Sequence, residues 1–122
     1  MEHHECDVAI VGGGIAGIAA ALELLDRKLR VLILDRDREE NFGGLAKESF
    51  GGIFIVDSPE QRRVGKADSP ELALADWKRF GELDETDPTH ALPLAWAEAY
   101  VGGCRSEVYD WLKANGISFL PI

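Results

Sequence analysis

Four residues near the start of the chain have the types and the spacing to hold the diphosphate and the ribose of a nucleotide. Gly12, Gly14 and Gly17 fit the pattern G-x-G-x-x-G, and Asp35 follows about 20 residues later. Glycine permits a tight turn at the first position and a close approach of the main chain to a diphosphate at the second; at the third it lets a helix pack near a strand. A carboxylate at the later position can accept hydrogen bonds from ribose hydroxyls. The pattern therefore predicts a dinucleotide site.

The residues around this motif predict the elements that must position it. Val8–Val11 is a short apolar run without alternation, which is typical of a strand buried on both faces in a parallel sheet, and Val31–Leu34 predicts a second strand. A helix is expected between them, from about Ile15 to Arg27. Its buried face is predicted by apolar residues at helical spacing, namely Ile15, Ile18, Ala19, Leu22 and Leu25.

The sequence makes a prediction for each end of this helix. The N–H groups of its first turn have no partner within the helix, so they would offer donors and a partial positive charge to a bound diphosphate. At the other end, Lys28 stands where a glycine usually takes the left-handed conformation. A lysine in that conformation is expected to cost about 1 kcal/mol.

A second glycine-rich stretch is the next candidate for phosphate binding. Two glycine pairs, Gly43-Gly44 and Gly51-Gly52, flank Ser49, so the stretch offers main-chain N–H groups and one hydroxyl. Alone, it fits a flexible surface loop equally well. Because it follows Asp35 closely, we favour phosphate binding, and we expect a short helix over Leu45–Ser49.

The rest of the chain predicts a mainly helical region. The expected elements are a short strand or extended segment over Ile53–Val56, a helix from Ser69-Pro70 to Gly81, a helical region from about Leu92 to Asn115 interrupted at Gly102-Gly103, and a short strand over Ile117–Leu120. We therefore expect one domain, with a nucleotide-binding part over residues 6–57 and a helical extension over residues 58–122.

Length, charge and cysteine content narrow the classes of function. The 122 residues amount to one domain at most, and 22 acidic against 13 basic residues give a net charge of −9, which argues against nucleic acid or an anionic membrane as a partner. Cys6 and Cys104 lie outside any C-x-x-C pattern and predict buried thiols in a reducing compartment, with neither a disulfide nor a metal site. No run reaches the length of a membrane span. These features predict a cytoplasmic protein.

With both glycine segments in view, the chain resembles the N-terminal part of the flavoprotein family that includes the fumarate reductase flavoprotein and 3-ketosteroid dehydrogenase. The matching segments are residues 8–17, 31–36, 43–44, 49–52 and 56–63, followed by 68–69, 76–77, 96–100 and 111–112. The resemblance implies an α/β fold: a Rossmann-like FAD-binding βαβ unit with additional helices, which is an incomplete part of a larger flavoprotein fold.

The resemblance also implies which residues contact FAD, position by position. They are Gly12, Gly14, Ile15, Ala16, Gly17, Asp35, Arg36, Gly43, Gly44, Ser49, Gly51 and Gly52. Asp35 takes the position of the ribose-binding acid, which is commonly Glu in FAD proteins. Family members that attach flavin covalently carry a His near the second loop, and none lies between Asn41 and Gly52. The resemblance therefore implies non-covalent FAD.

Three functions remain open at this point. In the first, the chain carries the FAD part of an oxidoreductase that moves a hydride between flavin N5 and a CH–CH bond of a small-molecule substrate, with catalytic residues that the sequence does not identify. In the second, the chain is an isolated dinucleotide-binding module; NAD belongs to this alternative, and the second glycine loop argues against NAD. In the third, the chain holds no cofactor and forms a homo-oligomer that covers its sheet edges and apolar faces.

Overall fold

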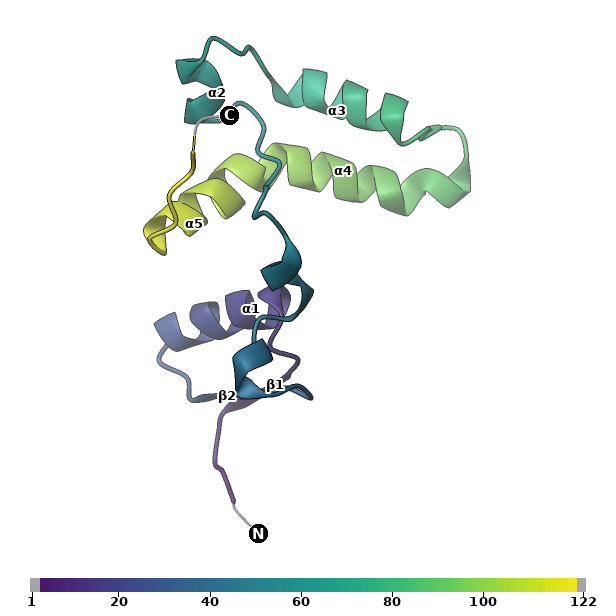
Figure 1. Cartoon of the computed structure of the whole chain (residues 1–122). Coiled ribbons are helices and arrows are strands. Elements are labelled where there is room, and N and C mark those ends of the chain that lie inside the picture. Colours follow the sequence, from purple (N-terminus) through teal and green to yellow (C-terminus); the bar gives the residue numbers. More distant parts are fainter. Residues whose placement is uncertain (1–2, 121–122) are drawn as a thin grey trace. The chain divides into compact units, whose positions relative to one another are not determined.

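The computed structural model describes residues 3–120 and divides the chain into two compact units, Met1–Gly52 and Ile53–Ile122 (Figure 1). The first unit contains β1 (Val8–Val11), α1 (Ile15–Asp26) and β2 (Val31–Leu34), followed by 3₁₀-helices at Glu39–Asn41 and Gly44–Glu48. The second contains α2 (Pro59–Arg63), α3 (Pro70–Phe80), α4 (Ala91–Gly103) and α5 (Asp110–Ala114), with a 3₁₀-helix at Pro88–His90 and a π-helix at Cys104–Tyr109. The predicted strand–helix–strand order of the first unit is confirmed.

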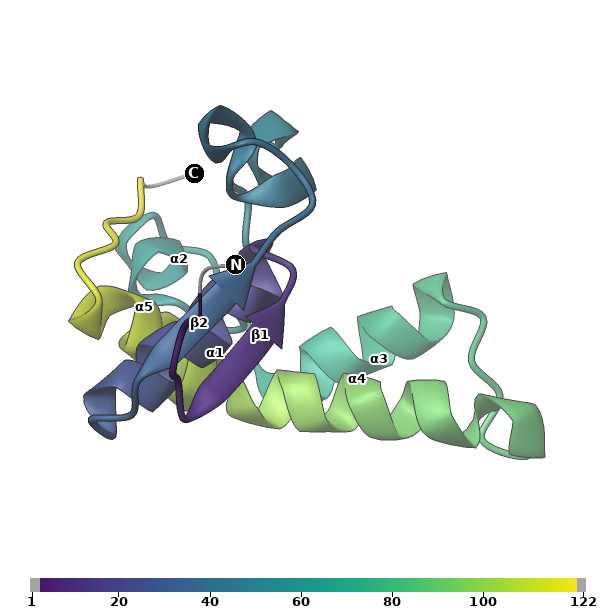
Figure 2. The ribbon, with the colours of Figure 1, turned by 90° about the horizontal axis from the view of Figure 1, so that it is seen from below.

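The two strands of the first unit run parallel in one sheet (Figure 2). Val8 lies opposite Val31 and Val11 opposite Leu34. A side-chain contact fixes the start of β1, because the Asp7 carboxylate accepts hydrogen bonds from the Arg30 main-chain N–H (2.8 Å) and from the Arg30 guanidinium (3.0 Å). Helix α1 runs between the strands in sequence and packs on the sheet. This parallel pairing places the end of β1 beside the end of β2, where Asp35 follows.

The predicted burial of the strand and helix faces is wrong: none of the five residues predicted for the buried face of α1, and no residue of β1 or β2, is buried. In α1 the one buried residue is Ala21, whereas the Ile15 side chain is 68% exposed and the Leu25 side chain 51%. Val11, at the end of β1, is 87% exposed. The physical reason is the width of the sheet, since two strands offer α1 too narrow a surface to cover its apolar face, and a strand buried on both faces needs a layer on each side.

Lys28 adopts the left-handed conformation expected at the end of α1, with φ of +64° and its N–H donating to the Leu25 carbonyl at 2.8 Å. Replacing Lys28 with glycine is therefore expected to raise the unfolding free energy of the first unit by about 0.5 to 1 kcal/mol, because glycine has no Cβ penalty there. Denaturant unfolding followed by far-UV circular dichroism measures this change. Arg27→Gly is the control, since Arg27 has φ of −81° and should lose stability; a gain at both positions would contradict the explanation.

Helices α3 and α4 of the second unit lie side by side as an antiparallel hairpin (Figures 1 and 2). Helix α3 begins and ends as predicted: the Ser69 hydroxyl accepts from the Leu72 N–H (3.2 Å), Pro70 opens the helix and Gly81 follows it. In the connection, the Asp84 N–H donates to Nδ1 of His90 at 2.9 Å. Within residues 3–120, none of the helices combines the length and the apolar character needed to cross a membrane.

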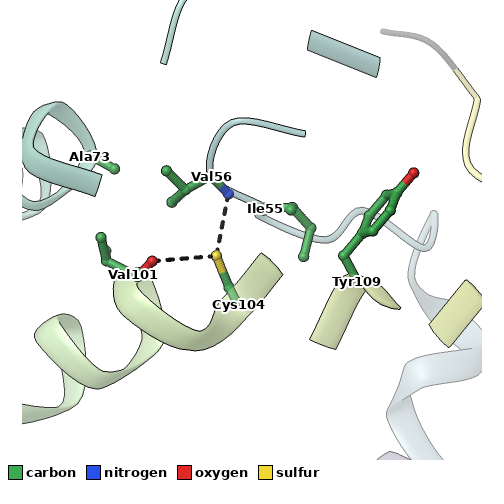
Figure 3. Close-up of a cluster of buried hydrophobic side chains, with 6 residues drawn as sticks. All are labelled: Ile55, Val56, Ala73, Val101, Cys104 and Tyr109. Carbon is green, nitrogen blue, oxygen red and sulfur yellow. Dashed lines mark hydrogen bonds between the residues drawn. The ribbon is translucent and has the colours of Figure 1, made fainter. Parts of the chain in front are cut away.

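The core of the second unit gathers around the extended segment at residues 53–56 (Figure 3). Its buried members are Ile55, Val56, Ala73, Val101, Cys104 and Tyr109. The Val56 N–H donates to Cys104 Sγ at 3.3 Å, and the Cys104 thiol donates to the Val101 carbonyl at 3.8 Å. The segment thus bonds to a helix through a side chain, and it pairs with no strand of the described chain.

Two further predictions for the second unit have different outcomes. The long helical region is interrupted as expected, since α4 ends at Gly103 and the chain continues through the π-helix into α5. The predicted strand at Ile117–Leu120 is wrong: the described residues show no strand there. A strand needs an edge to pair with, and Phe119 instead stacks on the ring of Tyr109, with 4.9 Å between ring centroids.

Candidate functional site

The glycine turn of the first unit connects the end of β1 to the start of α1. Gly12 has φ of +103°, a conformation that favours glycine, and its N–H donates to the Leu34 carbonyl at 2.8 Å, which extends the strand pairing by one residue. Gly14 precedes α1 with φ of −75° and caps it without a side chain. The N–H groups of the first helical turn, at Ile15, Ala16 and Gly17, have no carbonyl within the helix to bond, so they carry its partial positive charge.

Gly17 and Gly14 lack side chains for opposite physical reasons. A Cβ on Gly17 would lie 2.0 Å from the Gly12 carbonyl oxygen, so this glycine allows α1 to approach the turn closely. A Cβ on Gly14 would meet no atom of the protein within 4 Å. Gly17 is therefore required by packing, whereas the space at Gly14 is open to a ligand.

Asp35 follows β2 and lies directly beside the glycine turn. Its Oδ2 accepts from the Gly13 N–H at 2.5 Å and its Oδ1 accepts from the Asp37 N–H at 2.9 Å. These bonds, that from Asp37 first and that from Gly13 second, hold the pKa of the Asp35 carboxyl below its ordinary value of 3.8. The carboxylate is thus kept ionised, and its remaining lone pairs can accept hydrogen bonds from hydroxyl groups.

Because the folded protein lowers the pKa of Asp35, its ionised form contributes stability above the unfolded pKa of about 3.8. This contribution is expected to disappear as pH falls through the lower, folded pKa. Unfolding free energies of the wild-type chain and of Asp35→Asn, measured between pH 7 and pH 2, should therefore differ most above pH 4 and converge in acid. A difference that stays constant across this range would contradict the assigned bonds.

The second glycine loop contacts the first glycine turn through the main chain. Gly14 and Gly43 form an isolated parallel bridge, and a Cβ on Gly44 would lie 3.4 Å from the Gly14 Cα. Gly43 has φ of +114°, which again favours glycine. The structure thus brings together three predicted parts: the glycine turn, Asp35 and the start of the second loop.

These parts border a cavity of about 530 Å³ at the carboxyl ends of the two strands. The predicted residues Gly12, Asp35, Arg36 and Gly44 line it. The lining also includes residues that sequence reasoning did not single out, namely Asp37, Asn41, Lys47 and Glu48. In open α/β sheets, this edge is where ligands bind.

Lys47 is the most informative of the residues that the sequence interpretation missed. It lies in the last turn of the 3₁₀-helix Gly44–Glu48, and its Nζ donates to the Glu40 carbonyl at 2.5 Å. With Arg36 it gives the cavity two cations beside the carboxylates of Asp35, Asp37 and Glu48, and these two cations are the groups that could pair with a diphosphate. A lysine three residues after a glycine pair is a signal that could have been noticed.

Ser49, Gly51 and Gly52 lie apart from this cavity in the described structure. The Ser49 hydroxyl accepts from the Gly51 N–H at 2.9 Å, so these residues form a separate turn. The ring of Phe50 between them is 99% exposed. Of the predicted residues, only Gly12, Asp35, Arg36 and Gly44 line the cavity, and Gly14 and Gly43 adjoin it through their bridge. Ile15, Ala16 and Gly17 are not in the lining, and the end of the second loop is separate from it.

Comparisons with known proteins agree with this geometry. The model of the FAD binding domain family matches residues 7–121. A KsdD-like steroid dehydrogenase of Mycobacterium tuberculosis is 50% identical over 116 residues, which cover 95% of this chain and 20% of the relative. A fumarate reductase (cytochrome) of Shewanella frigidimarina is 34% identical over 120 residues, covering 98% of this chain and 19% of the relative.

A solved structure gives the same result for the fold. The crystal structure of 3-ketosteroid-Δ4-(5α)-dehydrogenase from Rhodococcus jostii RHA1, in complex with 4-androstene-3,17-dione, matches with a TM-score of 0.77 and 29% identity, over 97% of this chain and 23% of that one. The chain thus spans about a fifth of the length of these relatives. The resemblance, the α/β fold class and FAD as the cofactor are confirmed. The chain belongs to the FAD binding domain family.

Proposed function

We propose that the chain binds FAD non-covalently and contributes this part to a flavin-dependent dehydrogenase or reductase that acts on a CH–CH bond. The observation that carries the proposal is the meeting of the glycine turn, Asp35 and the second glycine loop around one cavity of the first unit. Bound FAD would supply hydride transfer at flavin N5. The chain's own residues would bind and orient the adenosine diphosphate half.

The residue roles in this proposal follow from the chemistry of each group. The first-turn amides at Ile15, Ala16 and Gly17 donate to the diphosphate, and the bare main chain at Gly12 and Gly14 lets it come close. The second loop supplies further contacts from Gly43 and Gly44, and the proposal extends these contacts to Ser49, Gly51 and Gly52, which lie apart from the cavity. The Asp35 carboxylate accepts hydrogen bonds from the ribose hydroxyls, while Arg36 adds a positive charge to the site.

Three finer features belong to the same proposal. The loop between Asn41 and Gly52 has no His, which supports non-covalent attachment. Cys6 and Cys104 are both free thiols, which favours a reducing compartment such as the cytoplasm. The relatives that are 46% to 50% identical are named steroid dehydrogenases, which favours a steroid as the small-molecule substrate of the whole protein.

Titration of the purified chain with FAD tests the proposal. A change in flavin fluorescence should show saturable binding, and ADP should compete with FAD whereas riboflavin should not, because the cavity takes the adenosine diphosphate half. NAD carries the same adenosine diphosphate half and should compete as ADP does. A folded chain that shows no affinity for FAD would overturn the proposal.

Light scattering during the same titration measures the mass of the chain in solution. The first unit exposes large apolar side chains, with Val11 87%, Leu45 88% and Phe50 99% exposed. We therefore propose that the free chain self-associates as a homo-oligomer. A monomeric mass with and without FAD would contradict self-association while leaving FAD binding standing.

A further inference from the structure

Gly13 occupies the position that the glycine pattern leaves open, yet a side chain there would overlap the ring of Phe42 as the structure places it. A Cβ on residue 13 would lie 2.2 Å from Cε2 and 2.8 Å from Cδ2 of the Phe42 ring, and 3.0 Å from Asp35 Oδ2. Such distances are far inside van der Waals contact. The backbone of Gly13 is not in the left-handed region, so the obstacle to a side chain is one of space and not of conformation.

Phe42 is joined to the second glycine loop next to its bridge with the glycine turn. It directly precedes Gly43, whose main chain forms the bridge with Gly14. Its N–H donates to the Glu39 carbonyl at 3.1 Å, and its side chain is 42% exposed, so the ring rests against residue 13 from the outside. The ring and the bridge thus tie the loop to the glycine turn at consecutive residues.

The same residue 13 is also bonded to the proposed ribose acid, because its N–H donates to Asp35 Oδ2 at 2.5 Å. Gly13 therefore contacts two groups at once, the Phe42 ring through its bare Cα and the Asp35 carboxylate through its N–H. Neither Gly13 nor Phe42 is among the described residues that line the cavity. Any influence of this pair on a ligand must pass through Asp35 and the second loop.

We propose that Gly13 and Phe42 form a positioning pair, in which the ring packed against the bare main chain holds the second glycine loop and Asp35 in register for the adenosine diphosphate half of FAD. The inference rests on the proposed function of this cavity. It adds two residues to the site, one on each glycine segment, that neither the motif nor the cavity identifies. A side chain at residue 13 displaces the ring and, with it, the loop that the ring anchors.

The direct test of the contact needs no cofactor. In the NMR spectrum of the wild-type chain, nuclear Overhauser effects are expected between the Phe42 ring protons and the α-protons of Gly13. Their absence would overturn the inference whatever the affinity for FAD.

The functional test is a double-mutant cycle on the FAD dissociation constant, measured at a temperature at which circular dichroism shows every variant to be folded. Gly13→Ala and Phe42→Ala are each expected to weaken binding by roughly 3- to 10-fold. The double variant should lose no more affinity than the single variant with the larger loss, because both substitutions remove the same contact. Gly102→Ala and Phe80→Ala are the matched controls, since both lie on helices of the second unit and Gly102 has open space around it.

The outcomes separate the inference from the proposed function. If the wild-type chain binds FAD and the two effects multiply, or Gly13→Ala has no effect, the positioning pair is wrong and the FAD site stands. If the wild-type chain shows the ring contact but no affinity for FAD, both the proposed function and the inference that rests on it are overturned. Non-additive losses in a chain that binds FAD would support both.

Discussion

Replacing Gly14 with alanine is expected to weaken FAD binding by roughly 10- to 100-fold, while changing the unfolding free energy by no more than about 1 kcal/mol. The reason lies in the empty space at this residue, since a Cβ there would meet no protein atom within 4 Å. Its backbone, with φ of −75°, also accepts any L residue. A methyl group at Gly14 would therefore leave the fold intact and keep the diphosphate away from the helix N-terminus.

Two measurements on the same sample separate these effects. Flavin fluorescence gives the dissociation constant, and denaturant unfolding followed by circular dichroism gives the stability. Gly102→Ala is the control, because it also adds a methyl group in open space, on helix α4 of the second unit. If Gly14→Ala bound FAD as tightly as the wild type, no ligand atom would approach Gly14, and the diphosphate position would have to be abandoned.

The parts of the site that could be predicted are those that depend on local sequence. The turn at Gly12, the start of α1 at Ile15 and the parallel strands follow from residue types within a few positions of one another. The place of Asp35 beside the turn then follows from the parallel pairing, since the carboxyl ends of adjacent parallel strands lie at the same edge. The left-handed conformation of Lys28 was predictable for the same reason.

The parts that could not be predicted depend on contacts between residues far apart in sequence. The pattern G-x-G-x-x-G leaves residue 13 free, and only the position of the Phe42 ring shows that a side chain there would overlap it. Likewise, residues 117–120 have the composition of a strand, but whether a strand forms depends on an available edge, and Phe119 packs on Tyr109 instead. Exposure of Val11 reflects the width of the sheet, which no single strand encodes.

Replacing Gly17 with alanine is expected to have the largest effect on the fold of the first unit, a loss of about 1 to 3 kcal/mol in unfolding free energy. A Cβ at this position would lie 2.0 Å from the Gly12 carbonyl oxygen and 3.3 Å from Cγ2 of Ile10. The nearest atom belongs to the main chain, so no side-chain rotation relieves the overlap. Helix α1 would have to move away from the turn, and FAD affinity would fall with it.

The sign of this change distinguishes packing from helix propensity. Alanine is favoured over glycine in a helix by about 1 kcal/mol, so propensity alone predicts that Gly17→Ala stabilises α1. Gly102→Ala measures the effect of helix propensity alone, because Gly102 lies in α4 with no atom near its Cβ position. This substitution should raise the unfolding free energy of the second unit. Circular dichroism follows both units, whereas fluorescence of Trp77, Trp96 and Trp111 follows only the second, to which all three belong. A first unit that gains stability from Gly17→Ala would show that α1 does not pack on the turn as closely as the 2.0 Å distance requires.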